Sequence, residues 1–377
     1  MNLGGAINMI KTVCSLHLCT SCTSCVSICP AKCIHLRREI CYTDAVIDES
    51  RCLNCGLCKE VCQQIMPRKI VSSSNPDVYV GKAKEGEASL LCSSGGIATV
   101  LSKAFLDEGN YVCGSVFSEG HVFHFLTDRK GDLQKFCGSK YVKSDLRNVF
   151  VDIKKVILSH KVLFIGTPCQ VCGIKTYLGR FGLLKNFYSI DLICHGTPQE
   201  SVLGKYLQEK FKGTQITSIS FRRKEKLSLS INGKFKYSRV CDPYTMSFLK
   251  GVNYTENCYS CRFANLNREG DITLGDAWGE QKNGSSNGLS LILVSSDKGR
   301  ILFDKIKQSI VFSGKDISEF IPYNSQLMHP SPKNPERQFF FRKFYTQKYS
   351  QIMRHLYRKE TLKQEIKRIL IWARVLK

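Results

Sequence analysis

The sequence predicts an α+β/α/β protein with a small cysteine-rich N-terminal domain, a larger α/β domain with a mixed sheet, and a helical C-terminal tail. Cysteines crowd into residues 14–66, which lack long periodic segments, as in a small domain held by metal rather than by apolar packing. Two strand-then-helix units follow in mid-chain, and this alternation favours a parallel sheet covered by helices. From Gln338 onward the pattern is helical.

Length and composition set the class of protein. The 377 residues, 43% of them hydrophobic, are enough for two or three domains. No run approaches the roughly 18 apolar residues that span a bilayer, and the first residues lack the apolar stretch of a secretory signal. We therefore expect a cytoplasmic protein. In that reducing compartment, 20 cysteines indicate metal binding rather than disulfides.

The cysteine-rich segment carries one spacing twice. The first run, C-x2-C-x2-C-x3-C-P, consists of Cys19, Cys22, Cys25, Cys29 and Pro30; the second consists of Cys52, Cys55, Cys58 and Cys62, with Gln63 in place of proline. Three such cysteines hold one corner of a cubane, and in two-cluster ferredoxins the distant fourth ligates the other cluster. We therefore expect a two-cluster [4Fe–4S] ferredoxin-like domain over residues 10–70.

The expected ligands are crossed between the two runs. Cluster one takes Cys19, Cys22, Cys25 and Cys62; cluster two takes Cys52, Cys55, Cys58 and Cys29. Zinc is the alternative metal. Because a zinc site is satisfied by four ligands, often two C-x2-C pairs, eight cysteines in this doubled pattern favour the ferredoxin interpretation.

Beyond this domain the patterns predict the following elements in order. Residues 71–76 form a linker, 96–107 a helix, 111–117 and 121–126 a strand pair, and 146–159 a helix. The two strand-then-helix units are 161–165 with 170–178, and 187–193 with 198–211. Residues 216–221, 227–231 and 234–240 are antiparallel strands, and 271–274 and 289–295 are further strands. We divide this part of the chain into 78–160, 161–325 and a basic helical tail, 336–377.

A third group of cysteines lies in the α/β part. Cys169 and Cys194 each follow one of the two predicted parallel strands, whose carboxyl ends share the sheet edge where such proteins bind ligands. Cys258 and Cys261 form a further C-x2-C, so four thiolates are available for a third [4Fe–4S] cluster. Buried thiols and a four-cysteine zinc site are the alternatives. The remaining cysteines, expected to be core thiols, are Cys14, Cys33, Cys41, Cys92, Cys113, Cys137, Cys172 and Cys241, of which Cys172 is close enough to replace a neighbour.

Several short motifs occur in an order that resembles the coenzyme F420 hydrogenase/dehydrogenase beta subunit family over residues 15–325. They are Ser94-Gly95-Gly96, Gly138-Ser139-Lys140-Tyr141, Gly166-Thr167-Pro168-Cys169-Gln170, Cys194-His195-Gly196, Ser220-Phe221-Arg222, Cys258-Tyr259-Ser260-Cys261, and Arg268 before Asp271-Ile272-Thr273-Leu274-Gly275-Asp276. The chain is most similar to bacterial relatives with a fused ferredoxin segment, many of them in surface-polysaccharide gene clusters. Cys172 and the basic tail depart from the family pattern.

The resemblance implies an FAD-binding α/β domain that exchanges electrons with iron–sulfur clusters. A flavin exchanges both hydride and single electrons, so it can connect an organic substrate to cubanes. We expect the diphosphate to meet backbone N–H groups at a helix start, although these residues are also ordinary there. They are Ser93, Ser94, Gly95 and Gly96.

Each of the other candidate residues has a functional and a structural interpretation. Lys140 and Tyr141 are expected to contact the flavin, with a surface lysine and a half-buried tyrosine as the alternative. His195 is the candidate catalytic proton donor, although a turn histidine is more often simply hydrogen-bonded. Arg222, Arg268 and Asp276 either orient loops as ion pairs or bind an anionic substrate.

The C-terminal tail carries 12 Lys and Arg against 3 Glu over residues 336–377, together with clustered aromatic and aliphatic residues. An amphipathic helix on an anionic membrane surface is one interpretation. A helical hairpin packed on the body is the preferred alternative. We expect no nucleic acid partner, because no recognition motif accompanies the charge.

These observations support three hypotheses. The first is an iron–sulfur flavoprotein oxidoreductase that moves electrons between clusters and FAD to reduce or oxidise a small organic substrate, with a ferredoxin or reductase as electron partner. The second is an electron-transfer subunit that relays electrons to a partner enzyme. The third is a metal-stapled interaction module without turnover. The substrate, the direction of electron flow, the use of coenzyme F420 and the oligomeric state stay open.

Overall fold

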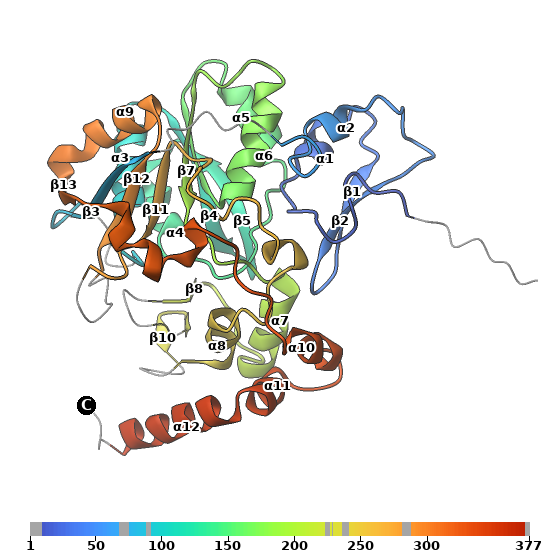
Figure 1. The fold of residues 1–377 in the computed structure, drawn as a ribbon, viewed down its shortest axis with the longest axis vertical. Helices are drawn as coiled ribbons and strands as arrows, with labels where there is room; N and C mark the ends of the chain where they lie inside the picture. Colours follow the sequence, from blue (N-terminus) through green and yellow to red (C-terminus); the bar gives the residue numbers. More distant parts are fainter. Residues whose placement is uncertain are drawn as a thin grey trace, which may run out of the picture.

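The computed structural model describes residues 10–67, 75–87, 92–222, 227, 229–235, 241–280 and 288–373. Most of the expected linker 71–76 and the end of the expected strand 234–240 lie outside these residues. Figure 1 shows the cysteine-rich segment to the right of a central sheet with helices on both faces, and the C-terminal helices along the bottom of the body.

The cysteine-rich segment has little regular structure. It consists of α1 (Ser24–Ile28), β1 (Ile34–Arg38), β2 (Thr43–Ile47) and α2 (Leu57–Glu60), with β1 and β2 paired antiparallel. Cysteine is prominent in its small core, which contains Val13, Cys19, Cys25, Cys33, Ile34, Ala45, Ile47 and Cys62. Helices of five and four residues are too short to be stable alone, so this segment depends on what its cysteines bind.

A mixed eight-stranded sheet forms the centre of the molecule, with the strand order β13-β3-β12-β11-β7-β6-β4-β5. Its strands are β3 (Asp77–Ala83), β4 (Tyr111–Ser118), β5 (His121–Thr127), β6 (Val162–Gly166), β7 (Phe187–Leu192), β11 (Ile272–Asp276), β12 (Ser290–Val294) and β13 (Ile310–Gly314). Strands β4, β6, β7 and β11 run parallel, and the other pairings are antiparallel. The expected mixed sheet is confirmed, and ranges 78–160 and 161–325 both contribute strands to it.

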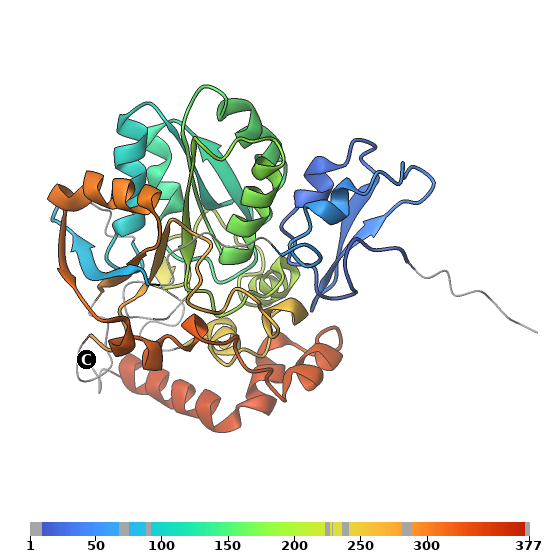
Figure 2. The same cartoon turned by 45° about the horizontal axis from the view of Figure 1, so that its top comes forward.

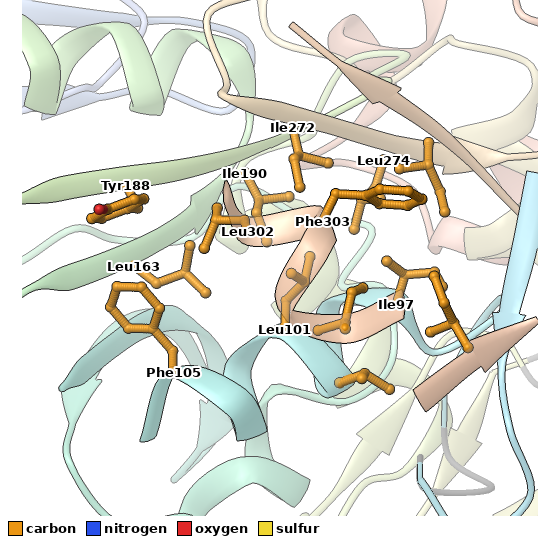
Figure 3. Packing of buried hydrophobic residues seen from close by; sticks show 14 of the residues in the cluster. Ile97, Leu101, Phe105, Leu163, Tyr188, Ile190, Ile272, Leu274, Leu302 and Phe303 are labelled. Carbon is orange, nitrogen blue, oxygen red and sulfur yellow. The ribbon is translucent and has the colours of Figure 1, made fainter. Parts of the chain in front are cut away.

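Helices cover both faces of this sheet (Figures 1 and 2). On one face lie α3 (Ile97–Asp107) and α9 (Asp297–Ile306); on the other lie α5 (Val149–Val156) and α6 (Pro168–Gly179). Successive strand residues point to opposite faces, so Leu163 of β6 packs with α3 and α9 (Figure 3), whereas Val162 and Phe164 pack with α5 and α6. The strands β3 and β13 and the helix α9 were not among the expected elements.

A second core lies at the end of the body that carries the C-terminal helices. It joins α7 (Glu200–Lys210) and α8 (Pro243–Leu249) to a small antiparallel sheet of β8 (Ile219–Ser220), β9 (Ser230–Ile231) and β10 (Lys234–Phe235). The C-terminal helices are α10 (Arg337–Lys343), α11 (Tyr349–Leu356) and α12 (Arg358–Trp372). Phe340 and Tyr349 are fully buried in this core, so the expected helical tail is confirmed and α10 and α11 pack on the body.

The last helix differs from the two before it. Leu362, Ile366 and Ile369 of α12 are exposed, so contact with a membrane surface through this tail stays a prediction. Within the described residues, none of the helices has the length and apolar character needed to cross a bilayer.

Candidate cofactor site

Four cavities succeed one another from the cysteine-rich segment into the sheet. The first cysteine cavity encloses about 310 Å³ and is lined by Cys19, Cys22, Cys25 and Cys62. Cys19 lies on the loop before α1 and Cys25 within α1, whereas Cys62 follows α2. All four thiols are at least nine-tenths buried. The structure therefore brings together the four cysteines that the crossed assignment groups as cluster one.

The second cysteine cavity encloses about 330 Å³ and is lined by Cys29, Cys52, Cys55 and Cys58. Gly56 begins α2 with a positive φ of 77°, a conformation that glycine adopts without strain. Cys55 is exposed, so this cavity lies at the surface. The four cysteines are those of the second crossed set.

Each of these cavities has a fifth cysteine that the sequence interpretation treated as a core thiol. Cys14 lines the first cavity, and hydrogen bonding from Cys14 lowers the pKa of Cys62 to about 7. Cys33 lines the second cavity, with its Sγ 3.5 Å from that of Cys29. Neither residue has a ligand-like spacing, so the sequence carried no signal for its position.

The third cysteine cavity, about 600 Å³, lies at the carboxyl ends of β6 and β7. It brings together Cys169 in the first turn of α6, Cys194 after β7, and Cys258 and Cys261 around a 3-10 helix (Glu256–Cys258). Desolvation raises the pKa of the Cys169 thiol to about 12, so a metal would have to displace its proton. Cys172 does not line this cavity; it faces Glu269 and Cys22 instead.

These cysteine groups differ from the site of a single metal ion. Across the described residues, no three His, Cys, Asp or Glu side chains converge as the ligands of one ion would. The thiolates of a cubane surround a whole iron–sulfur body and so stand further apart than the ligands of one zinc ion, whose Zn–S bonds are about 2.3 Å.

Arg268 holds the two halves of the third cavity in place. Its guanidinium is buried beside Asp191 of β7 at 3.4 Å and donates to the carbonyls of Phe263 and Leu192. It thereby ties the loop after Cys261 to the strand end before Cys194. Arg222 and Asp276 form a separate two-point ion pair, one bond of which is 2.8 Å long, so for both arginines the structure shows an ion pair that orients loops.

The large cavity, about 890 Å³, shares a wall with the third one. Its walls come from α3, from the loop around residues 138–144 and from the start of α6; they include Thr99, Ser102, Leu133, Phe136, Lys140, Ile165 and Gln170. Buried His124 also lines it, between Ser144 and the carbonyl of Ile165.

Residues 93–96, which were expected to hold the FAD diphosphate, make contacts outside the large cavity. Ser94 Oγ donates to the carbonyl of Leu289 and the Gly95 N–H donates to Ser290 Oγ, so these two residues fasten α3 to β12. Ser93 accepts from the N–H of Ser139, and Gly96 begins α3 with a φ of 78°. None of the residues 93–96 lines the large cavity.

Lys140, Tyr141 and His195 are also placed by the structure. Lys140 lines the large cavity, but its ammonium donates to the carbonyls of residues 135, 136 and 137, which uses all three of its N–H groups. Tyr141 stacks on Phe248 with ring centroids 4.4 Å apart and does not line the cavity. His195 lines the third cysteine cavity rather than the large one.

Three residues that sequence reasoning missed connect these cavities. Thr20 lines the first, third and large cavities, and Lys143 lines the third and large ones. Lys143 Nζ donates to Thr255 Oγ1 at 3.0 Å, and that hydroxyl lies 3.3 Å from Cys258 Sγ. Gln63 donates from Nε2 to Thr20 Oγ1 and to the Cys169 carbonyl at 2.9 Å. Gln63, which takes the place of the proline in the second motif, therefore links the first cavity to the third.

Comparisons with known proteins agree with this arrangement. Residues 159–319, which include all four cysteines of the third cavity, match the family described as the C terminus of the coenzyme F420 hydrogenase/dehydrogenase beta subunit. This part of the chain is similar to that family. The resemblance inferred from the sequence motifs is thus confirmed. Residues 45–64, which carry the second cysteine run, match the 4Fe-4S binding domain family, so the N-terminal segment contains a domain of that kind.

Two curated relatives and one solved structure are similar to the chain. The coenzyme F420-dependent sulfite reductase of Methanocaldococcus jannaschii is 22% identical over 314 residues, 78% of this chain and 46% of that protein. NADH-quinone oxidoreductase subunit I of Pelobacter propionicus is 36% identical over 55 residues, 12% of this chain and 30% of that protein. The chain thus spans less than half the length of either relative.

The solved structure is a chain of the F420-reducing [NiFe] hydrogenase complex of Methanosarcina barkeri. Its sequence identity to this chain is 14%, and its TM-score is 0.48 over 69% of this chain and 97% of that one.

Proposed function

We propose that this protein is an iron–sulfur flavoprotein oxidoreductase that passes electrons between [4Fe–4S] clusters and FAD in order to reduce or oxidise a small organic substrate. The observation that carries the proposal is the succession of four neighbouring cavities, of which the first, the third and the large one share wall residues. Three of the four are lined by four predicted ligand cysteines each, and the large cavity adjoins the third.

The electron path runs from the surface inward. The second cysteine cavity is the entry point, because Cys55 is exposed there, whereas the first cavity is closed off by the body. Gln63 and Thr20 then connect the first cavity to the third, and Lys143 connects the third to the large cavity. The exposed second cavity suits a one-electron carrier protein, such as a ferredoxin or a reductase, as the partner.

The third cysteine cavity is proposed to hold a third [4Fe–4S] cluster. Cys169 and Cys194 at the strand ends and Cys258 and Cys261 on the facing loop line one cavity, and four thiolates are the ligand number of one cubane. Lys143 and Arg268 place positive charge beside it, which offsets the negative charge that four thiolates bring. Zinc on the same four cysteines is the alternative that metal analysis separates.

FAD is proposed for the large cavity, where it would convert single electrons into a two-electron reaction with the substrate. The apolar side chains Leu133, Phe136 and Ile165 suit a flavin ring and exclude water from it. The pKa of buried His124 is lowered to about 4, so this ring is neutral at pH 7 and acts as a hydrogen-bonding wall residue. Lys143, rather than the fully engaged Lys140, supplies the cation for an anionic group in the cavity.

The catalytic role assigned to His195 changes in this proposal. Because its ring lines the third cavity, His195 would contact the cluster side rather than donate a proton to a substrate on the flavin. The use of coenzyme F420, suggested by the family description and by the sulfite reductase name, stays a prediction, as does the role in surface-polysaccharide biosynthesis that the bacterial resemblance implies.

An electron-transfer subunit is the second candidate function. It is favoured by the exposed Cys55 of the second cysteine cavity, where a partner protein could approach the expected cluster. In that case a partner enzyme would carry out the substrate chemistry.

The test is anaerobic purification followed by counting of iron, sulfide and flavin. About twelve iron atoms and one FAD per chain are expected for three cubanes and one flavin. About eight iron atoms without flavin would favour the electron-transfer subunit, and zinc without iron would overturn both proposals. Reduction of the bound flavin by a candidate substrate, without a partner protein, would identify the enzyme.

A further inference from the structure

We propose that Cys92 and Cys137 form a reversible disulfide, a two-electron redox site in the wall of the large cavity. Neither residue lines any of the three cysteine cavities. Cys92 lies just before the Ser93–Gly96 segment, and Cys137 lies directly after α4 (Leu133–Phe136). Their Sγ atoms are 3.9 Å apart although the residues are 45 positions apart in the chain. Rotation of the side chains has to bring the sulfurs to about 2.05 Å.

A threonine connects this cysteine pair to the cavity. Thr99 Oγ1 lies 3.2 Å from Cys92 Sγ and 3.7 Å from Cys137 Sγ, and Thr99 itself lines the large cavity. Both sulfurs therefore lie one side chain behind the cavity surface. A change in their bonding would alter the contacts of Thr99, a residue of the cavity lining.

A cation lies beside the same pair. The Lys140 ammonium donates to the Cys137 carbonyl at 3.0 Å and interacts electrostatically with both sulfurs. A neighbouring ammonium stabilises a thiolate, which is the form that attacks a disulfide. Lys140, which the sequence interpretation assigned to the flavin, is thus placed to activate this pair instead.

The exchange reaction is balanced with a low-molecular-weight disulfide as oxidant. Cys92 is buried and Cys137 half-buried, so the Cys137 thiolate attacks first and releases one small thiol. The Cys92 thiolate then displaces the second small thiol and closes the protein disulfide. The two protein thiols lose two electrons and two protons, and the small disulfide gains them as two thiols.

Closing the bond would join a segment of the cavity wall to the segment that fastens α3 to β12. The segment after Cys92 is fastened to β12 through Ser94 and Gly95, whereas the segment after Cys137 contributes Gly138, Ser139 and Lys140 to the cavity. In the oxidised protein these two segments can no longer move independently. The redox state of the pair would therefore set how readily an occupant enters or leaves the large cavity.

The test uses the full-length protein with its clusters, held without oxygen in glutathione buffers of graded thiol-to-disulfide ratio. The samples are then alkylated and digested, and the peptides are weighed. A cross-linked Cys92–Cys137 peptide is expected under oxidising buffers and lost under reducing ones. Cys137→Ser should abolish it, and Cys241→Ser, which changes a half-buried cysteine elsewhere, should leave it unchanged.

In wild-type protein, the proposal would be overturned if the two cysteines were alkylated or glutathionylated separately at every thiol-to-disulfide ratio. This outcome does not depend on whether the variants fold. A second measurement is reductive titration of oxidised protein, in which Cys137→Ser should consume two electrons fewer than the wild type. Iron and flavin are counted in the same samples. Failure of the cluster and flavin proposals is thereby distinguished from failure of this one.

Discussion

Gly173 lies on α6 where this helix meets the cysteine-rich segment. A Cβ at this position would stand 2.6 Å from the Cβ of Cys22 and 3.2 Å from its sulfur. Ser24 Oγ donates to the Gly173 carbonyl at 2.9 Å, which holds the two parts in contact. Only a residue without a side chain lets the first cysteine cavity lie this close to the sheet domain.

Gly173→Ala should therefore push α1 away from α6. Overpacking of this kind costs about 1–3 kcal/mol, and we expect a lower urea midpoint together with weaker retention of iron. The matched control is Gly204→Ala in α7, where an added Cβ meets no atom within 4 Å. That variant should be stabilised by up to about 1 kcal/mol through helix propensity. Equal urea midpoints and equal iron retention in the two variants would contradict the close contact between α6 and the cysteine-rich segment.

His124 illustrates how burial determines protonation. Its ring stacks on Phe164 with centroids 5.0 Å apart, accepts from Ser144 Oγ at 2.9 Å, and reaches the Ile165 carbonyl at 3.1 Å through its other nitrogen. Desolvation lowers its pKa from 6.5 to about 4. The folded protein therefore holds this ring neutral at pH values where the unfolded chain already binds a proton.

This difference in pKa predicts a pH-dependent stability. Above pH 6.5 this histidine is neutral in both states and leaves the free energy of unfolding unchanged. As the pH falls from 6.5 towards about 4, only the unfolded chain binds the proton, so the free energy of unfolding decreases by about 3 kcal/mol in total. Urea unfolding of wild type and His124→Gln, measured from pH 7 down to about 5, should show a shallower pH slope in the variant. His160→Gln, which changes an exposed histidine, serves as control and should keep the wild-type slope.

At the scale of elements, α1 and α2 lie side by side, and the last cysteine of each run lines the cavity formed by the other run. Cys29 follows α1 but lines the cavity around α2, and Cys62 follows α2 but lines the cavity around α1. The two short helices are thus connected through both cavities, so neither half of the segment can hold its cavity without the other.

The crossed arrangement predicts which variants resemble each other. Cys29→Ser should weaken the same cluster signal in electron paramagnetic resonance as Cys58→Ser, because both residues line the second cavity. Cys62→Ser should instead resemble Cys22→Ser. If Cys29→Ser and Cys22→Ser altered one common signal, the ligands would be grouped by sequence run and the crossed assignment would be wrong.

At the scale of the whole molecule, the third cysteine cavity is assembled from segments that only the sheet brings together. Cys169 and Cys194 follow neighbouring parallel strands, and Cys258 and Cys261 reach the same place from a loop that Arg268 ties to β7. This position, at the carboxyl edge of the parallel strands, is where open α/β sheets bind ligands. It also places the third cavity between the ferredoxin-type cavities and the large one.

Replacement of any one cysteine of this set should remove about four iron atoms per chain, the content of one cubane. Cys194→Ala is the clearest variant, because no other described part of the second strand unit supplies a thiol to this cavity. Cys172→Ala is the matched control: it lies on the same helix as Cys169 but faces away from the cavity, so its iron content should equal that of the wild type. Unchanged iron in Cys194→Ala would exclude a third cluster on these residues.

The sequence by itself determined the elements whose signal is local. The spacing of Cys19 to Cys29 and of Cys52 to Cys62 follows from how a short peptide wraps a metal body, and the strand-then-helix units follow from apolar periodicity. Both can be recognised in a single stretch of chain. The family resemblance was available for the same reason, because each of its motifs is short and contiguous.

The tertiary structure alone decided which side chains share a cavity. Sequence spacing carried no signal for Cys14, Cys33, Thr20 or Lys143. The family resemblance assigned Lys140 to a flavin, and only the structure shows that three backbone carbonyls engage its ammonium. The strands β3 and β13 were likewise missed, because their place depends on partners far along the chain. Cavity walls and long-range pairings are made when distant segments pack together, and a local pattern does not encode which distant atoms will meet.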